Sequence, residues 1–195
     1  MTRANKTFSK KLIEKYATGK YEIWSTDECH FHQHGTRFRM WLPKDIKDPT
    51  VIQEPNRLKV SIFGSVNVDT GRLVYCMNSI FNAETFLEHL KKILQGRSKR
   101  RKILLIVDNA RYHHAKVIQP WLERNKRKIE FMFLPPYSPE LNPIERVWKK
   151  TRYLATHNRY FPTLESLSSE ISQRLNIWDL PNEELTSLCS INYVA

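Results

Sequence analysis

Three acidic residues lie at positions where a folded chain could bring them together. Asp27 ends an apolar, β-prone run, Asp108 follows the apolar run 103–107, and Glu145 opens a helical pattern. Magnesium and manganese ions prefer hard oxygen ligands, and a site for two ions needs carboxylates that are far apart in sequence and close in space. The three acids are therefore typical of metal-assisted phosphodiester chemistry.

The segments around these acids predict a mixed α/β sheet with helices on both faces. Alternation and apolar runs indicate strands over 21–27, 58–68, 73–77, 102–107 and 129–134, and helical spacing indicates helices over 82–96, 115–125, 143–155 and 163–178. The first three strands read as an antiparallel meander. The last two are continuous apolar runs separated by a helix, as in parallel strands buried on both faces. Pro120 should kink or restart the helix in which it lies.

The position of Asp108 within this sheet favours a functional role. Ligands of open α/β sheets collect beyond the carboxyl ends of the strands, where Asp108 lies. Asp27 would stand on the first strand, and neighbouring parallel strands would bring the two carboxylates together. Glu145 would then arrive from the helix that follows the last strand.

The chain reads as one compact domain with additions at both ends. Its 195 residues, of which 41% are hydrophobic, suffice for a core without disulfides or a structural metal. We expect a basic linker or leading helix over 1–20 and the main α/β domain over 21–160. A C-terminal helical extension over 161–195 should pack on the same domain.

Cysteine content and hydrophobicity point to an intracellular protein. Cys29, Cys76 and Cys189 show no paired spacing that would indicate a disulfide framework or a cysteine zinc site. No stretch approaches the roughly 20 apolar residues of a membrane span, and the N-terminus lacks the apolar core of a signal peptide. We therefore expect a soluble, cytoplasmic protein with no membrane partner.

The charge of the chain favours a polyanionic partner. Lys and Arg number 32 against 20 Asp and Glu, which gives a formal net charge of +12 and a pI of about 9.7. The excess gathers in two clusters, 97–102 and 124–128. Such clustering favours nucleic acid over the alternative of a merely solvated basic surface.

Each acid also has an ordinary explanation. Asp108 with Asn109 could end a strand in a turn, and Asp27 could be a polar strand end. Asn142, followed three residues later by Glu145, resembles a capping box in which the glutamate is structural. These alternatives remain open from the residues alone.

Three sequence segments carry a resemblance to a known family. They are STDE at 25–28, VDNARYHH at 107–114 and LPPYSPELNPIE at 134–145. Together they closely resemble the catalytic core of mariner-like DDE transposases, especially the bacterial insertion-sequence branch. The likeness covers roughly residues 20–160, and the third segment is its most specific part.

The resemblance implies a ribonuclease H-like fold with a five-stranded mixed sheet. It identifies Asp27, Asp108 and Glu145 as the catalytic, metal-binding triad of a DNA transposase, with two Mg²⁺ or Mn²⁺ ions. The implied reaction is strand cleavage by activated water followed by strand transfer from a 3′-hydroxyl, as in DNA transposition, recombination and integration. Adjacent strand residues point to opposite faces, so only one of Asp27 and Glu28 should line the site, and the family motif selects Asp27.

Several cations near the triad are candidates for DNA contact. Arg111, His113 and His114 follow Asp108, and His113 and His114 could instead order the site or simply begin a helix. Arg146, Lys149 and Lys150 share one face of the helix that carries Glu145. The alternative for that face is a solvated surface with a Glu145–Lys149 ion pair.

Three alternating histidines invite a different site. His30, His32 and His34 would share one face of a strand, where a zinc ion could be considered. No fourth ligand is spaced to join them, so histidines near DNA are the favoured interpretation.

The resemblance also sets expectations about partners. Family members usually carry an N-terminal helix-turn-helix region that recognises transposon ends, and only about 20 residues precede the first expected strand. We therefore expect either a separately encoded or frameshift-fused N-terminal DNA-binding region or a truncated copy of the transposase. We also expect a homodimer on transposon ends and target DNA, and a nucleoid-associated location. The competing interpretations are a non-catalytic DNA-binding remnant, a recruited transposase core, or another nuclease on the same fold.

Overall fold

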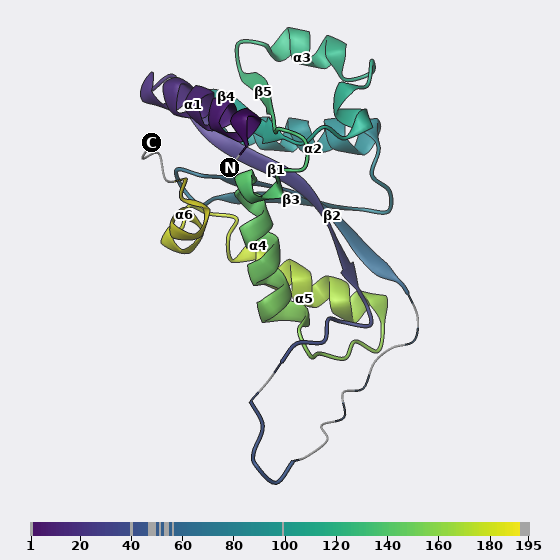
Figure 1. Ribbon diagram of the computed structural model, residues 1–195. Helices are drawn as coiled ribbons and strands as arrows, with labels where there is room; N and C mark the ends of the chain where they lie inside the picture. The colour runs from purple at the N-terminus through teal and green to yellow at the C-terminus, as the bar shows by residue number, and fades with distance from the viewer. Residues whose placement is uncertain are drawn as a thin grey trace.

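A five-stranded mixed sheet forms the centre of the computed structural model (Figure 1). The structure describes residues 2–39, 41–46, 50, 52, 55, 57–98 and 100–191. The strand order is β3-β2-β1-β4-β5. The strands are β1 (Tyr21–His32), β2 (Lys59–Asn67), β3 (Leu73–Asn78), β4 (Lys102–Val107) and β5 (Ile129–Phe133).

The pairing of the strands confirms the expected mixture of directions. β1 pairs with β2, and β2 with β3, in antiparallel ladders, whereas β4 is parallel to both β1 and β5. β1 is longer than the strand expected over 21–27, because the alternation of buried side chains continues through Cys29 and Phe31. The β2–β3 turn contains Gly71 at φ 70°, a conformation that favours glycine.

Helices cover both faces of the sheet. They are α1 (Arg3–Ala17), α2 (Ala83–Gln95), α3 (Gln119–Asn125), α4 (Ile144–Thr151), α5 (Leu164–Asn176) and α6 (Glu183–Cys189). The turns η1 (Arg111–His114) and η2 (Pro139–Leu141) are 3₁₀-helical, and the π-helical segment η3 (Arg152–Thr156) continues α4. Figure 1 shows α2 and α3 on one side of the sheet and α4, α5 and α6 on the other.

The side chains of β4 show why both faces must be covered. Ile103, Leu105 and Val107 pack toward α2 and α3, while Leu104 and Ile106 belong to the cluster formed with α1. All five side chains are fully buried, as a continuous apolar run in a central parallel strand predicts.

Two further features bear on the sequence-based expectations. Residues 1–20 contain the helix α1 rather than an unstructured linker. The pattern 115–125 yields a helix only from Gln119, with Pro120 in its first turn, so the proline restarts the helix as expected. Within the described part of the chain, none of the helices has both the length and the apolar character needed to cross a membrane.

The C-terminal segment packs on the face that carries α4. Leu167, Ile171 and Leu175 of α5 and Leu185 of α6 belong to one buried cluster with residues of β1, β2 and α4. The separate helix α6 is not evident from the sequence pattern, which indicates a single helix in this region. Residues 192–195 of the expected extension lie outside the described residues.

Candidate active site

The parallel register of β1 and β4 brings the first two acids together. Ser25 pairs with Ile106, and two positions further along each chain lie Asp27 and Asp108. Both acids line a cleft of about 390 Å³ together with Glu145 and the proline-rich segment 134–142. The three residues predicted as the triad therefore come from β1, the end of β4 and α4, and meet at one place.

Side-chain hydrogen bonds attach the start of α4 to β1. The Ser25 hydroxyl donates to the Asn142 side-chain oxygen and accepts from the backbone N–H of Ile144 at 3.1 Å. The Asn142 amide donates to the Thr26 carbonyl at 3.2 Å. These contacts fix where Glu145, one residue beyond Ile144, stands relative to Asp27.

The same bonds correct the predicted start of this helix. Asn142 is not the N-cap, because the cap position is Pro143 and no side chain caps the helix. The Asn142 side chain is already engaged by β1, so the capping-box explanation of Glu145 does not hold. The side chain of Asn142 therefore bonds a neighbouring strand and does not cap the helix that follows it, although the sequence suggests such a cap.

A glycine lets α4 lie directly on the sheet beside Asp27. Gly64 of β2 pairs with Asp27 across the ladder. A Cβ added at Gly64 would lie 2.3 Å from Cη2 and 2.6 Å from Cζ2 of Trp148 in α4. An isolated glycine inside a buried strand often marks such a close approach, and this signal was available in the sequence.

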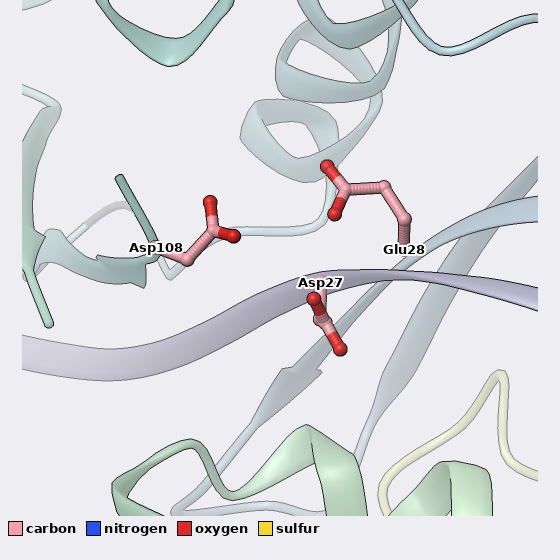
Figure 2. Close-up of side chains that lie close together, drawn as sticks. All are labelled: Asp27, Glu28 and Asp108. Atoms are coloured by element: carbon pink, nitrogen blue, oxygen red, sulfur yellow. The ribbon is translucent and has the colours of Figure 1, made fainter. Parts of the chain in front are cut away.

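The carboxylates form a tighter group than the sequence indicates. Figure 2 shows Asp27 and Glu28 leaving β1 on opposite sides, as expected, with the Asp108 carboxylate pointing toward that of Glu28. One oxygen from each of Asp27, Glu28 and Asp108 lies within 4.8 Å of the others. We call these three residues the acid cluster.

As expected, Asp27 lines the cleft and Glu28 does not, but the Glu28 carboxylate still lies close to Asp108. Alternation does separate the two side chains, but Asp108 lies beyond the last residue of β4 and is not confined to one face of the sheet. Its carboxylate reaches the face that carries Glu28, while Asp27 faces α4. The closeness of Glu28 to Asp108 is the feature that the sequence argument did not anticipate.

His113 of η1 contacts and orients Asp108. Its Nδ1 lies 2.9 Å from Oδ1 of Asp108 and 3.1 Å from the Asp108 carbonyl, and its Nε2 lies 3.6 Å from Oε1 of Glu28. The His113 side chain is only 1% exposed. A direct contact of His113 with DNA is therefore a wrong expectation, whereas the alternative role of ordering the site agrees with this geometry.

The electrostatics of the cluster show uncompensated negative charge. Burial, followed by the charges of Glu145 and Asp108, raises the pKa of Asp27 to about 7, although the Glu28 backbone N–H opposes the rise. The Trp148 indole also lies near this carboxylate but makes no full hydrogen bond. Burial and the charges of Asp27 and Asp108 raise the pKa of Glu28 to about 8.

Asp108 differs from its neighbours in the cluster. The hydrogen bond from His113 lowers the pKa of Asp108, although partial burial opposes the effect. The backbone N–H of Ala110 also donates to its Oδ1 at 2.9 Å. Asp108 is therefore held as an oriented carboxylate.

The basic residues of α4 are only partly available to a ligand. Arg146 donates to the carbonyls of Leu188 and Ser190 at 3.1 and 2.9 Å, and Lys150 pairs with Glu184 at 2.6 Å. These two cations hold the segment around α6. Arg146 is still exposed and lines the same hollow as Glu145 and Lys149, so DNA contact by Arg146 and Lys150 stays a prediction.

Lys149, Arg111 and His114 remain exposed near the acids. Lys149 lines the same surface hollow as Glu145, and no ion pair links these two described residues. Arg111 and His114 are exposed on η1, where His114 stacks on the Phe133 ring with centroids 4.5 Å apart. These three positions stay predictions for DNA contact.

The two basic clusters lie away from the cleft. Clusters 97–102 and 124–128 immediately precede the parallel strands β4 and β5, whereas Asp108 follows the carboxyl end of β4. The length of such a strand is about 20 Å. Their described members therefore cannot contact a phosphate inside the cleft, and Lys99 lies outside the described residues.

The alternating histidines do not assemble into a metal site. His30 bonds the Ser61 hydroxyl at 2.9 Å, and His32 stacks on His34. Among residues whose placement is described, the acid cluster is the group of acids, histidines or cysteines close enough to share one ion.

Solved structures with a similar fold are transposases. The Mos1 mariner paired-end complex with Mn has a TM-score of 0.70 and 18% identity over 95% of this chain and 57% of its own. The catalytic domain of Mos1 mariner transposase has a TM-score of 0.64 and 15% identity over 97% of this chain and 88% of its own. The fold is therefore the expected ribonuclease H-like fold.

Two curated relatives are proteins of transposable elements. The Tc3 transposase of Caenorhabditis elegans is 32% identical over 177 residues, 87% of this chain and 49% of the relative. The 39 kDa protein of insertion element IS630 from Shigella sonnei is 23% identical over 154 residues, 79% of this chain and 44% of the relative. The chain thus spans about half the length of these two relatives.

The family model described as DDE superfamily endonuclease matches residues 22–168. This range includes the three acids that line the cleft, the neighbouring Glu28 and the elements that position them. The match confirms the resemblance inferred from the three sequence segments, and the chain belongs to the DDE superfamily endonuclease family.

Proposed function

We propose that this chain is the catalytic domain of a DNA transposase that cuts DNA and joins a freed 3′-hydroxyl to target DNA. The observation that carries the proposal is the meeting of Asp27, Asp108 and Glu145 in one cleft, from three elements far apart in the chain. This arrangement suits a metal-dependent phosphodiester reaction. Family membership supports the same reaction class.

The residues at the cleft fit Mg²⁺ or Mn²⁺. The donors are carboxylate oxygens, which these hard ions prefer. The raised pKa values of Asp27 and Glu28 show that burial and mutual repulsion disfavour the charged acids, and a divalent cation would compensate that charge. We propose that Asp27, Asp108 and Glu145 hold two ions, which when bound supply activation of water or a 3′-hydroxyl and stabilise charge at the phosphate.

The protein groups around the cleft have distinct tasks in this proposal. His113 orients Asp108 through its Nδ1–H. Ser25 and Asn142 hold the first turn of α4, and with it Glu145, against β1. Lys149 at the rim is placed to contact a backbone phosphate of the bound strand.

The partners follow from the reaction. The similar Mos1 structures include a paired-end complex with a transposon end and a strand transfer complex, and we propose that this chain likewise acts on transposon ends and target DNA as a homodimer. Because the chain spans about half of its relatives, a further N-terminal DNA-binding region is part of the proposal. A nucleoid-associated location would follow from DNA binding.

A cleavage and joining assay tests this function. The substrate is a labelled duplex that carries the ends of the element encoding the chain, incubated with Mn²⁺. We expect strand cleavage and strand-transfer products, and we expect Asp108→Asn to lower both by about 100-fold or more. Glu123→Gln, which removes an exposed acid on α3, is the matched control and should keep full activity.

The same assay separates the competing interpretations. Cleavage without strand transfer would indicate another nuclease on this fold. DNA binding without cleavage would indicate a non-catalytic core, and full activity of the Asp108→Asn protein would refute the assignment of the triad.

A further inference from the structure

Glu28 has a position that the proposed triad does not explain. Its side chain is 15% exposed, and its Oε1 is buried without a hydrogen-bond partner. Figure 2 shows it directed toward Asp108 on the face of β1 opposite to Asp27. A buried acceptor that lacks a partner costs free energy, so this placement requires a reason.

A second buried polar atom faces the Glu28 carboxylate. His113 Nε2 also has no hydrogen-bond partner, and it lies 3.6 Å from Oε1 of Glu28. The other ring nitrogen of His113 is already bound to Asp108. The histidine therefore sits between two carboxylates, with one side engaged and the other side directed at the unpartnered oxygen.

The distances in the acid cluster suit a shared cation. One oxygen from each of Asp27, Glu28 and Asp108 lies within 4.8 Å of the other two. Oxygens on opposite sides of one ion are about 4–5 Å apart, given metal–oxygen distances of about 2.1–2.6 Å. Glu145 lies outside this group and contributes its charge mainly to Asp27.

We propose that Glu28 is a fourth metal-binding carboxylate, which shares one ion with Asp27 and Asp108 while His113 positions Asp108. This inference rests on the proposed function, because it places an additional ligand at the same centre. What the inference adds is that an ion between the middle of β1 and the end of β4 is held from both faces of β1. Glu145 would then serve mainly the Asp27 side of the cleft.

Manganese binding by the full chain tests the proposal without requiring activity. The metal-free protein is titrated with MnCl₂, and free Mn²⁺ is measured by electron paramagnetic resonance. We expect Glu28→Gln to weaken binding by at least about tenfold, because even groups that only support a ligand contribute about 10–100-fold. Glu123→Gln on the surface of α3 should leave the affinity unchanged.

A second variant separates ligation from a distant charge effect. Glu28→Asp keeps the charge but shortens the side chain by one methylene. Direct ligation predicts weaker binding for both variants. Unchanged affinity of Glu28→Asp, together with weak binding of Glu28→Gln, would overturn ligation and leave Glu28 as a nearby charge.

Asp108→Asn distinguishes the failure of this inference from the failure of the proposed function. If Asp108→Asn loses Mn²⁺ and Glu28→Gln does not, the fourth ligand is refuted and the proposed metal centre stands. If both variants bind Mn²⁺ like the unaltered protein, the metal centre itself is refuted. Far-UV circular dichroism and thermal unfolding of each variant establish that any loss of binding occurs in folded protein.

Discussion

Replacing Gly64 by alanine should disturb the catalytic cleft through a single methyl group. The added Cβ would lie 2.3 Å from Cη2 of Trp148, whereas carbon atoms in contact are about 3.5–4.0 Å apart. The indole, and with it α4, must therefore move by about 1 Å or more. Gly64 does not have a positive φ, so the cost comes from this overlap and not from backbone strain.

The expected loss of stability follows from overpacking. Inserting a methyl group into a well-packed core typically costs about 1–3 kcal/mol, and urea denaturation should show this loss as a lower midpoint with an unchanged slope. Gly96→Ala is the matched control. Its Cβ would meet only the flexible end of Arg72, at 3.0 Å, and should leave stability nearly unchanged.

The double variant tests whether Trp148 is the cause. Trp148→Phe removes the two ring atoms that would clash and leaves space when made alone. Gly64→Ala combined with Trp148→Phe should therefore be more stable than the sum of the single changes predicts. Additive effects, or full stability of Gly64→Ala, would refute the reasoning.

The same change should reduce cleavage more than it reduces the folded fraction. Glu145 lies one turn before Trp148 in α4, so moving the indole also moves this acid relative to Asp27. A displacement of about 1 Å in a catalytic group can lower the rate by about 100-fold. Cleavage assayed well below the unfolding midpoint separates this effect from lost stability.

Four other outcomes follow from the site. Asp27 and Glu28 hold protons more tightly in the folded protein, with pKa values of about 7 and 8 against ordinary values of 3.8 and 4.5. The metal-free protein should therefore lose stability as pH rises from about 4 to about 8. Mn²⁺ affinity should rise over pH 6–8, by up to about tenfold per pH unit for each proton released. Calorimetry in buffers of different ionisation enthalpy measures the number of protons released. A stability and a Mn²⁺ affinity that do not depend on pH would contradict both statements. Lys149→Glu should weaken duplex binding and reduce its salt dependence by about one phosphate contact. Lys150→Glu should mainly lower the unfolding midpoint, because Lys150 pairs with an acid of α6. Equal effects of the two variants on DNA binding would contradict this distinction. His113→Ala should weaken Mn²⁺ binding by about 10–100-fold. His113→Asn keeps a nitrogen donor near the Nδ1 position and should retain more of the Mn²⁺ affinity. Equal losses of affinity would contradict the role of the hydrogen bond between His113 and Asp108.

Local patterns in the sequence predict much of this fold because they agree with its tertiary contacts. The apolar run that forms β4 requires two covered faces, and the structure supplies α2 and α3 on one and α1 on the other. Pro120 restarts its helix because it lacks the N–H that a helix interior needs. The parallel arrangement follows from the helix between β4 and β5.

The failures come from contacts that local patterns do not contain. Asn142 looks like a helix cap, but Ser25 of β1 takes its side chain instead. Lys150 lies on a polar helix face, but its ammonium group pairs with Glu184 of α6, a helix that the sequence does not mark clearly. Alternation along β1 keeps Glu28 out of the cleft lining, but it does not show that Asp108, beyond the end of β4, brings its carboxylate close to Glu28.

The basic clusters illustrate a different limit. Their positions in the sequence indicate a polyanionic partner, but sequence position alone does not show which end of the sheet they occupy. The structure places the described members before β4 and β5 and the acids after β4. Net charge therefore bears on the class of partner and not on the location of the cleft.

A crystal structure of the protein soaked in Mn²⁺, with an anomalous difference map, tests the central claim most directly. It requires no knowledge of the DNA ends. The account predicts a manganese peak between Asp27 and Asp108, with Glu28 as a further ligand and Glu145 close by. Ordered acids with no manganese peak at the cleft, or carboxylates that point apart in the crystal, would contradict it.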